Sequence, residues 1–172
     1  MGIQRYFIDN KINKILDKVK KLKEKRTLSK IDAIAVFVDE YIAFNDKEFT
    51  KLQKLMGLDH THFNIITYKE KKSNFNEFRG TVILSSDIDW KGRIKSKDVQ
   101  ETLNKKYDLL IDYTQADQQK KQLIVAICNA GFKVGFSDKK DELYDFMIAV
   151  NPSKVSLFNE ELVRYLKILK LA

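Results

Sequence analysis

The stretch "IDAIAVFV", Ile31 to Val38, is apolar at nearly every position. A strand with one solvated face alternates apolar and polar side chains, whereas a strand covered on both faces is apolar almost throughout. This stretch therefore predicts a central strand of a sheet that carries helices on both faces.

Predicted strands and helices alternate along the rest of the chain. Strands are predicted at 62–68, 81–86, 107–114, 132–136 and 144–150, and helices at 45–57, 96–106, 117–131 and 156–170. This alternation predicts a single Rossmann-like α/β domain, a three-layer sandwich with helices on both faces of a mostly parallel sheet of five to six strands.

Two details of this fold follow from local signals. Gly131 follows a predicted helix and fits the left-handed position at which helices often end. The interval between the last two strands is too short for a long crossover. We therefore expect a short loop between them, with one of the two strands at an antiparallel edge of the sheet.

A long basic helix is predicted before this domain, at residues 3–26. Its apolar side chains recur at spacings of four, three, four and three and form one stripe: Ile8, Ile12, Ile15, Val19 and Leu22. Residues 1–30 carry ten Lys/Arg and three Asp/Glu, whereas the other 142 residues carry 22 and 21. We therefore divide the chain into a basic amphipathic helix with its linker (1–29) and an α/β domain (30–172), and expect an anionic partner for the helix.

The loop "DIDWKGRIK", Asp87 to Lys95, holds the only tryptophan of the chain among cations. An aromatic ring among basic side chains can stack on a base, although such platforms normally use more than one ring. The alternative is that Trp90 packs at the sheet edge and the cations are solvated. With the basic helix, the loop provides the predicted contacts for RNA or another polyanion: Lys11, Lys14, Lys18, Lys21, Lys25, Arg26, Trp90, Lys91 and Arg93.

Acidic residues stand at the predicted carboxyl ends of three strands. Open α/β sheets bind ligands at this edge, so Asp39, Asp87 and Asp112 form a possible ligand edge. The alternative is that they cap helices and shape turns. No G-x-G-x-x-G or P-loop pattern follows the first strand, so we expect no bound nucleotide.

Signals for catalysis or a metal are weak. His60 and His62 are the only histidines, and Asp59 is a poor third ligand, so we predict no metal site. Cys128, the only cysteine, lies in the apolar stretch "LIVAICNAG", which favours a buried and inert thiol. We therefore expect no cofactor, and we favour a protein without catalysis while an enzyme stays an open alternative.

The sequence also favours a cytoplasmic location. No apolar run approaches the roughly 18 residues that span a bilayer. Charges interrupt the apolar residues from the start of the chain, unlike in a signal peptide.

Three function classes remain open. The first is a non-catalytic, RNA-associated and ribosome-associated accessory protein. The second is a Rossmann-like small-molecule binder or enzyme that uses the strand-end carboxylates. The third is an adaptor that docks helix 3–26 on a protein groove or on anionic lipid, with lipid the less favoured surface. The helix could also pack its stripe on the domain, which would leave its basic face free. The oligomeric state stays open.

The segments "YDLLIDYT … AICNAGFKVGF … YDFMIAV" and the loop "DIDWKGRIKS" resemble an uncharacterised family of small Bacteroidetes proteins over roughly residues 28–150. This resemblance implies no established activity. The portion "YDLLIDYT … NAGFKVGF" is also similar to one strand–helix–strand unit of lipopolysaccharide heptosyltransferases. That similarity implies the fold and not the chemistry, because the second domain of those enzymes has no counterpart here.

Overall fold

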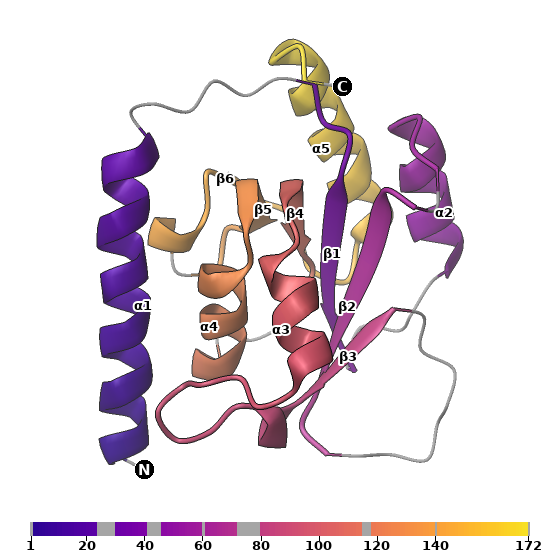
Figure 1. Ribbon diagram of the computed structural model, residues 1–172. Coiled ribbons are helices and arrows are strands. Elements are labelled where there is room, and N and C mark those ends of the chain that lie inside the picture. Colours follow the sequence, from indigo (N-terminus) through magenta and orange to yellow (C-terminus); the bar gives the residue numbers. More distant parts are fainter. Residues whose placement is uncertain are drawn as a thin grey trace.

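A computed structural model describes residues 2–23, 30–40, 46–59, 61–71, 80–114, 118–139 and 141–171. Within them, six strands form one sheet in the order β3-β2-β1-β4-β5-β6, and every neighbouring pair is parallel (Figure 1). The strands are β1 (Ile34–Asp39), β2 (Phe63–Lys69), β3 (Thr81–Leu84), β4 (Tyr107–Asp112), β5 (Ala130–Phe136) and β6 (Phe146–Ile148). This confirms the predicted α/β class, and the strand order is that of Rossmann-type sheets.

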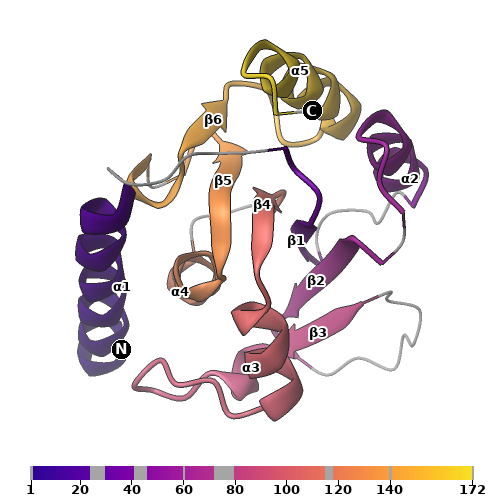
Figure 2. The same cartoon turned by 45° about the horizontal axis from the view of Figure 1, so that its top comes forward.

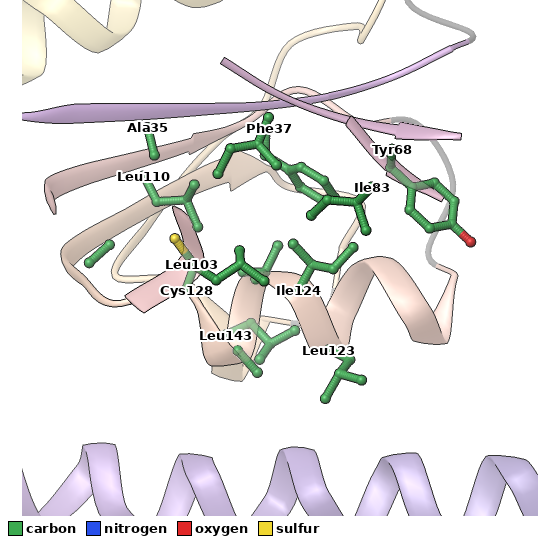
Figure 3. Packing of buried hydrophobic residues seen from close by; sticks show 14 of the residues in the cluster. Ala35, Phe37, Tyr68, Ile83, Leu103, Leu110, Leu123, Ile124, Cys128 and Leu143 are labelled. Atoms are coloured by element: carbon green, nitrogen blue, oxygen red, sulfur yellow. The ribbon is translucent and has the colours of Figure 1, made fainter. Parts of the chain in front are cut away.

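Helices cover both faces of the sheet (Figure 2). Helices α3 (Lys97–Asn104) and α4 (Gln119–Ile127) lie on one face, and α2 (Asp46–Leu55) and α5 (Val155–Ile168) on the other. Successive side chains of a strand point to opposite faces. In β1, Ala35 and Phe37 therefore join the core under α3 and α4. Figure 3 shows them on the side of Ile124 of α4, whereas Leu123 lies on the opposite side of that helix, toward α1.

Helix α1 (Gly2–Lys23) adds an outer layer beyond α4 (Figures 1 and 2). Its side chains Ile8, Ile12 and Leu16 are buried in the same cluster as Leu123 of α4. The first part of the predicted apolar stripe is therefore covered within the chain, Ile15 and Val19 are half-buried, and the side chain of Leu22 lies outside the described part of the structure. The helix was predicted to reach residue 26, and residues 24–26 lie outside the described part of the structure.

The expected antiparallel edge between the last two strands is wrong, because β6 runs parallel to β5. Strand β6 pairs only with the last part of β5, where Phe146 lies opposite Val134. To place Phe146 beside Val134, the chain has to run back along β5 from Phe136 by only about 7 Å, the length of two strand residues. The connection 137–145 is long enough to do this without a full helical crossover.

The expected helix end at Gly131 is also wrong. Helix α4 ends at Ile127, and Gly131 lies within β5. The reason is pairing across the chain, because Tyr107 N–H donates to Asn129 O and Asn129 N–H donates to Leu103 O. Once the backbone of this segment is engaged beside β4, it can no longer extend the helix.

Strand β3 is shorter than the predicted strand 81–86. It ends at Leu84, whose N–H donates to the Asp87 carboxylate at 2.8 Å, and Ser85–Asp87 form a helical turn. A local side-chain acceptor thus ends the strand.

None of the helices in the described segments has the length and apolar character needed to cross a membrane.

Candidate nucleic-acid interface

Helix α1 separates a buried apolar face from an exposed basic one. Lys14 and Lys18 are exposed, and Lys11 is half-buried. These lysines follow one another at spacings of three and four residues and therefore lie along one flank of the helix. Lys21 belongs to the same flank by spacing, although its side chain is outside the described part. Lys25 and Arg26 also lie outside the described residues.

The loop Ile88–Lys95 docks on the first half of α1 (Figures 1 and 2). Lys11 Nζ donates to the carbonyl oxygen of Gly92 at 2.6 Å. Gly92 has a φ of 71°, and an added Cβ would lie 3.1 Å from Leu123 Cδ2 and 3.4 Å from Ile8 Cγ1. Glycine is required here both for the left-handed backbone and for the fit between α1 and α4.

Asp89 holds the loop in shape. Its Oδ1 accepts the backbone N–H groups of Lys91 at 2.8 Å and Arg93 at 2.9 Å, and its Oδ2 accepts Arg93 Nε at 2.7 Å. The backbone hydrogen bond from Arg93 is the main reason why the pKa of Asp89 lies below its ordinary value. The turn that carries Trp90 is thus braced by its own carboxylate.

Trp90 meets one aromatic residue of α1, Phe7, which in turn meets Tyr6. The Trp90 and Phe7 ring centroids are 5.2 Å apart at an interplanar angle of 88°, and Phe7 meets Tyr6 edge-on at 5.8 Å. Lys91 Nζ lies 4.7 Å from the Trp90 ring. Trp90 therefore packs on α1 and not at the sheet edge, and it remains 49% exposed.

Lys11 of α1 and Arg93 of the loop are close enough to interact electrostatically. The pKa of Lys11 is lowered, mainly because the side chain is desolvated, and Arg93 lowers it further while Asp89 raises it. Lys14 and Lys18 lie about 4.5 and 10.5 Å farther along the helix axis than Lys11, at 1.5 Å per residue.

We call this region the α1–loop surface. It unites predicted residues from two distant segments and adds Tyr6 and Phe7, which the sequence analysis did not select. Their position just before the lysines of α1 is the sequence feature that could have indicated them. Its described members are Tyr6, Phe7, Lys11, Lys14, Lys18, Trp90, Lys91 and Arg93.

Two of the strand-end carboxylates are engaged in buried ion pairs. Asp39 Oδ2 lies 2.6 Å from Lys121 Nζ, and both side chains are buried. Asp112 Oδ2 lies 2.7 Å from Lys139 Nζ and accepts Tyr144 Oη–H at 2.6 Å. These contacts join the carboxyl ends of the two central strands to later parts of the chain.

The third carboxylate, Asp87, accepts the Leu84 N–H and closes the turn after β3. The structure therefore does not bring Asp39, Asp87 and Asp112 together around a common site. Among the residues that the structure describes, no group of three or more His, Cys, Asp or Glu is placed to hold a metal ion.

An open cavity of about 870 Å³ lies at the carboxyl ends of β2 and β3, beside the first turns of α1 and α4. Lys120 Nζ donates to Ser85 O and Oγ, each at 2.8 Å, and desolvation lowers its pKa. Tyr68 Oη–H donates to Glu70 at 3.1 Å, and burial raises the pKa of Tyr68 to about 12. This cavity was not predicted from the sequence. The sequence feature that could have indicated it is the polar stretch "DQQKKQ" after the predicted strand 107–114, which supplies part of the lining.

Charges of both signs line this cavity. Arg5 and Asp9 of α1 face each other at 3.9 Å, and Gln119 donates to Asp9 Oδ1 at 2.7 Å. Lys120 and Glu70 supply a further cation and anion. The near balance of charge distinguishes the cavity from the cationic α1–loop surface.

The remaining candidates behave as ordinary structural residues. His62 is exposed, with Nδ1 3.0 Å from Asp59 Oδ1, and His60 lies outside the described residues. Cys128 is buried, and desolvation raises its pKa to about 11. A thiol with so high a pKa is a weak nucleophile at neutral pH, as the apolar sequence around it predicts.

The comparisons with known proteins concern nearly the whole chain. No curated protein matches it. The profile of a family of unknown function, DUF6913, matches residues 4–169, a range that includes α1 as well as the sheet and its helices. The chain therefore belongs to DUF6913, a family of unknown function.

Proposed function

We propose that this protein is a non-catalytic, RNA-associated accessory protein of the cytoplasm. It binds the phosphate backbone through the α1–loop surface, and the ribosome is the RNA-rich partner to test first. One observation carries the proposal. The apolar stripe of α1 is buried on α4 while Lys11 anchors the loop, so cations of two elements stand on one exposed flank.

The physical basis is counterion release. Lysine and arginine side chains that neutralise phosphates release the ions condensed on the RNA. The logarithm of the affinity then falls with the logarithm of the salt concentration, with a slope of roughly 0.7 to 0.9 per phosphate contact. A packed helix presents its cations in a fixed array, whereas a free tail would have to be ordered on binding. Because the rest of the chain is nearly neutral, binding should be confined to this surface.

The test is a charge reversal in the full chain. The double variant Lys14→Glu/Lys18→Glu changes two exposed residues of the surface. We expect its affinity for a labelled RNA to fall at least ten-fold at low salt. Without these two contacts, the slope of log affinity against log salt should decrease by roughly 1.5. Fluorescence anisotropy over a series of KCl concentrations measures both.

The matched control is Lys47→Glu/Lys54→Glu on α2, across the sheet. It makes the same change of net charge at exposed positions and should reduce affinity less than three-fold. An equal loss in both variants would show that net charge and not this surface governs binding, and would overturn the proposal. Co-sedimentation of the same variants with ribosomes tests the ribosomal part.

The cavity favours a second candidate function, a binder of a small polar ligand. Open α/β sheets take ligands at this edge, and the lining combines hydroxyl, amide and balanced charged groups suited to a neutral ligand such as a nucleoside or a sugar. A thermal-shift screen with nucleosides and monosaccharides should then raise the Tm. A screen without any shift would reject this candidate.

The adaptor alternatives have less support. Docking of α1 in a protein groove or on lipid would use the stripe that α4 already covers. The helix would first have to expose Ile8, Ile12 and Leu16 to water, at a cost of roughly 1.5 to 3 kcal/mol for each fully buried side chain. The likeness to Bacteroidetes proteins and to a heptosyltransferase segment adds no chemistry to the proposal.

A further inference from the structure

We infer that the RNA bound at the α1–loop surface is single-stranded, and that its unpaired bases stack on the aromatic side chains of Tyr6, Phe7 and Trp90. This inference rests on the proposed function and names the class of RNA. The proposed function needs only phosphates, whereas the aromatic side chains need bases.

These rings are not needed for the core. The interface between α1 and α4 is formed by Ile8, Ile12 and Leu16. Tyr6 and Phe7 lie outside that stripe and are 64% and 37% exposed. Together with Trp90 they form a continuous group of partly exposed rings on a strongly charged chain, and such exposed apolar groups commonly mark a binding surface.

The rings are also held in place. Trp90 lies in a turn braced by Asp89, and the same turn is anchored through Gly92 to Lys11 of α1. Phe7 is fixed on the helix itself. Ordering costs on binding are therefore small, because the backbone is set and each aromatic side chain has only two rotatable bonds.

Base pairing would keep the bases of an RNA away from these rings. In an A-form duplex the bases are stacked on one another, and the major groove is too narrow for side chains. Unpaired bases can turn outward and stack on aromatic rings, in a sequence-tolerant way. A duplex could meet Lys14 and Lys18 through its phosphates, but it would leave Trp90 and Phe7 unused.

The charges around the rings favour RNA over a protein partner. The rings are flanked by Lys11, Lys91 and Arg93, and the nearby carboxylate of Asp89 is occupied within the loop. Protein interfaces are depleted in lysine at their centres. Aromatic rings among cations are instead typical of proteins that bind single strands.

The experiment compares a 12-nucleotide oligouridylate with a 12-base-pair RNA duplex on the full chain. Trp90 is the only tryptophan, so its emission reports stacking directly. We expect the oligouridylate to quench this emission and the duplex to leave it unchanged. Trp90→Leu should weaken single-strand binding about ten-fold and change duplex binding less than two-fold, whereas Trp90→Phe, which keeps a ring, should recover part of the loss.

The outcomes separate the two proposals. If the wild-type protein binds both RNAs equally and Trp90→Leu weakens neither, the surface reads phosphates only. The inference then fails while the proposed function stands. If neither RNA binds at low salt, the proposed function fails and the inference with it. Lys14→Glu/Lys18→Glu serves as the reference variant, since it should weaken both RNAs.

Discussion

Gly92 lies where the loop Ile88–Lys95 meets both α1 and α4. Its carbonyl oxygen accepts a hydrogen bond from the Lys11 ammonium group, and its Cα faces Leu123 and Ile8. A single residue without a side chain thus joins three elements. The aromatic contact between Trp90 and Phe7 depends on this join, because the same turn carries Trp90.

We predict that Gly92→Ala destabilises the protein and moves Trp90. A left-handed alanine costs about 1 to 2 kcal/mol, and the crowding against Leu123 and Ile8 adds to that cost. Urea denaturation gives the free energy of unfolding, and the emission maximum of Trp90 reports its exposure. The control is Gly57→Ala. Gly57 also has a positive φ, of 66°, but an added Cβ there meets nothing within 4 Å. A loss in Gly92→Ala no larger than in Gly57→Ala would contradict this account.

Asp112 lies at the end of a central strand and is surrounded by partners. Lys139 Nζ, the Tyr144 hydroxyl group and the Thr114 backbone N–H all contact its carboxylate. The Tyr144 ring also lies directly over Gly135, where an added Cβ would be 2.6 Å from Tyr144 Cε1. The structural role of this carboxylate is therefore to fix the segment after β5 against the end of β4.

We predict that Asp112→Asn lowers the free energy of unfolding by roughly 3 to 5 kcal/mol, because the Lys139 charge stays buried without its counterion. The double variant Asp112→Asn/Lys139→Met should recover part of that loss. Asp32→Asn, which breaks the exposed pair with Lys30, should change stability by less than about 1 kcal/mol. Equal effects of the two single variants in urea denaturation would refute the buried-pair explanation.

At the scale of elements, α1 is attached to the domain through α4 rather than through the sheet. In proteins most of the stability of a helix comes from the packing of its amphipathic face, so the burial of its apolar side chains against α4 is what stabilises α1. The attachment is what turns a basic amphipathic segment into a fixed cationic surface. Its apolar contacts should therefore control both stability and the proposed binding of RNA.

We predict that Ile12→Ala, at a fully buried position of α1, destabilises the protein by about 2 to 5 kcal/mol. Ile3→Ala, at a position 72% exposed on the same helix, should have little effect. Circular dichroism during urea denaturation measures both. If the two variants unfold at the same urea concentration, α1 does not dock as described.

At the scale of the whole molecule, several buried acidic groups ionise later in the folded than in the unfolded state. Burial raises the pKa of Cys128 from 9.0 to about 11, and those of Tyr68 and Tyr107 from 10.0 to about 12. Above pH 9 the unfolded chain loses these protons first, so it binds fewer protons than the folded chain. The free energy of unfolding therefore falls as the pH rises.

We predict that the contribution of these three groups to the free energy of unfolding is fully present below pH 9 and is lost as the pH rises from 9 to 12. The lowered pKa values of Lys11 and Lys120 act with the opposite sign, so the prediction is best tested as a difference. Between pH 8 and 10.5, the free energy of unfolding should fall less steeply in Cys128→Ala than in the wild type. The thiol contributes at most roughly 3 kcal/mol, at 1.36 kcal/mol per pKa unit. Parallel pH profiles would show that the thiol does not contribute.

The sequence predicted those features that depend on local periodicity. The stretch from Ile34 to Val38 is buried at every position, as its continuous apolar character indicates. Ile8, Ile12 and Leu16 are buried because helical spacing places them on one face. The course of the chain after β5 and the end of α4 were predicted wrongly. The direction of β6 is set by its pairing with β5. The end of α4 is set by the hydrogen bonds of Asn129 with Leu103 and Tyr107, which are distant in the sequence.

The candidate site divides in the same way. The basic character of α1, the cations around Trp90 and the burial of Cys128 are properties of short segments, and the sequence alone determined them. The contact of Trp90 with Phe7, the pairing of Asp39 with Lys121 and the cavity beside Lys120 were decided only by the tertiary structure. Periodicity tells which face of an element is apolar. It cannot tell which side chains from remote segments meet, because that is set by how the layers pack against one another.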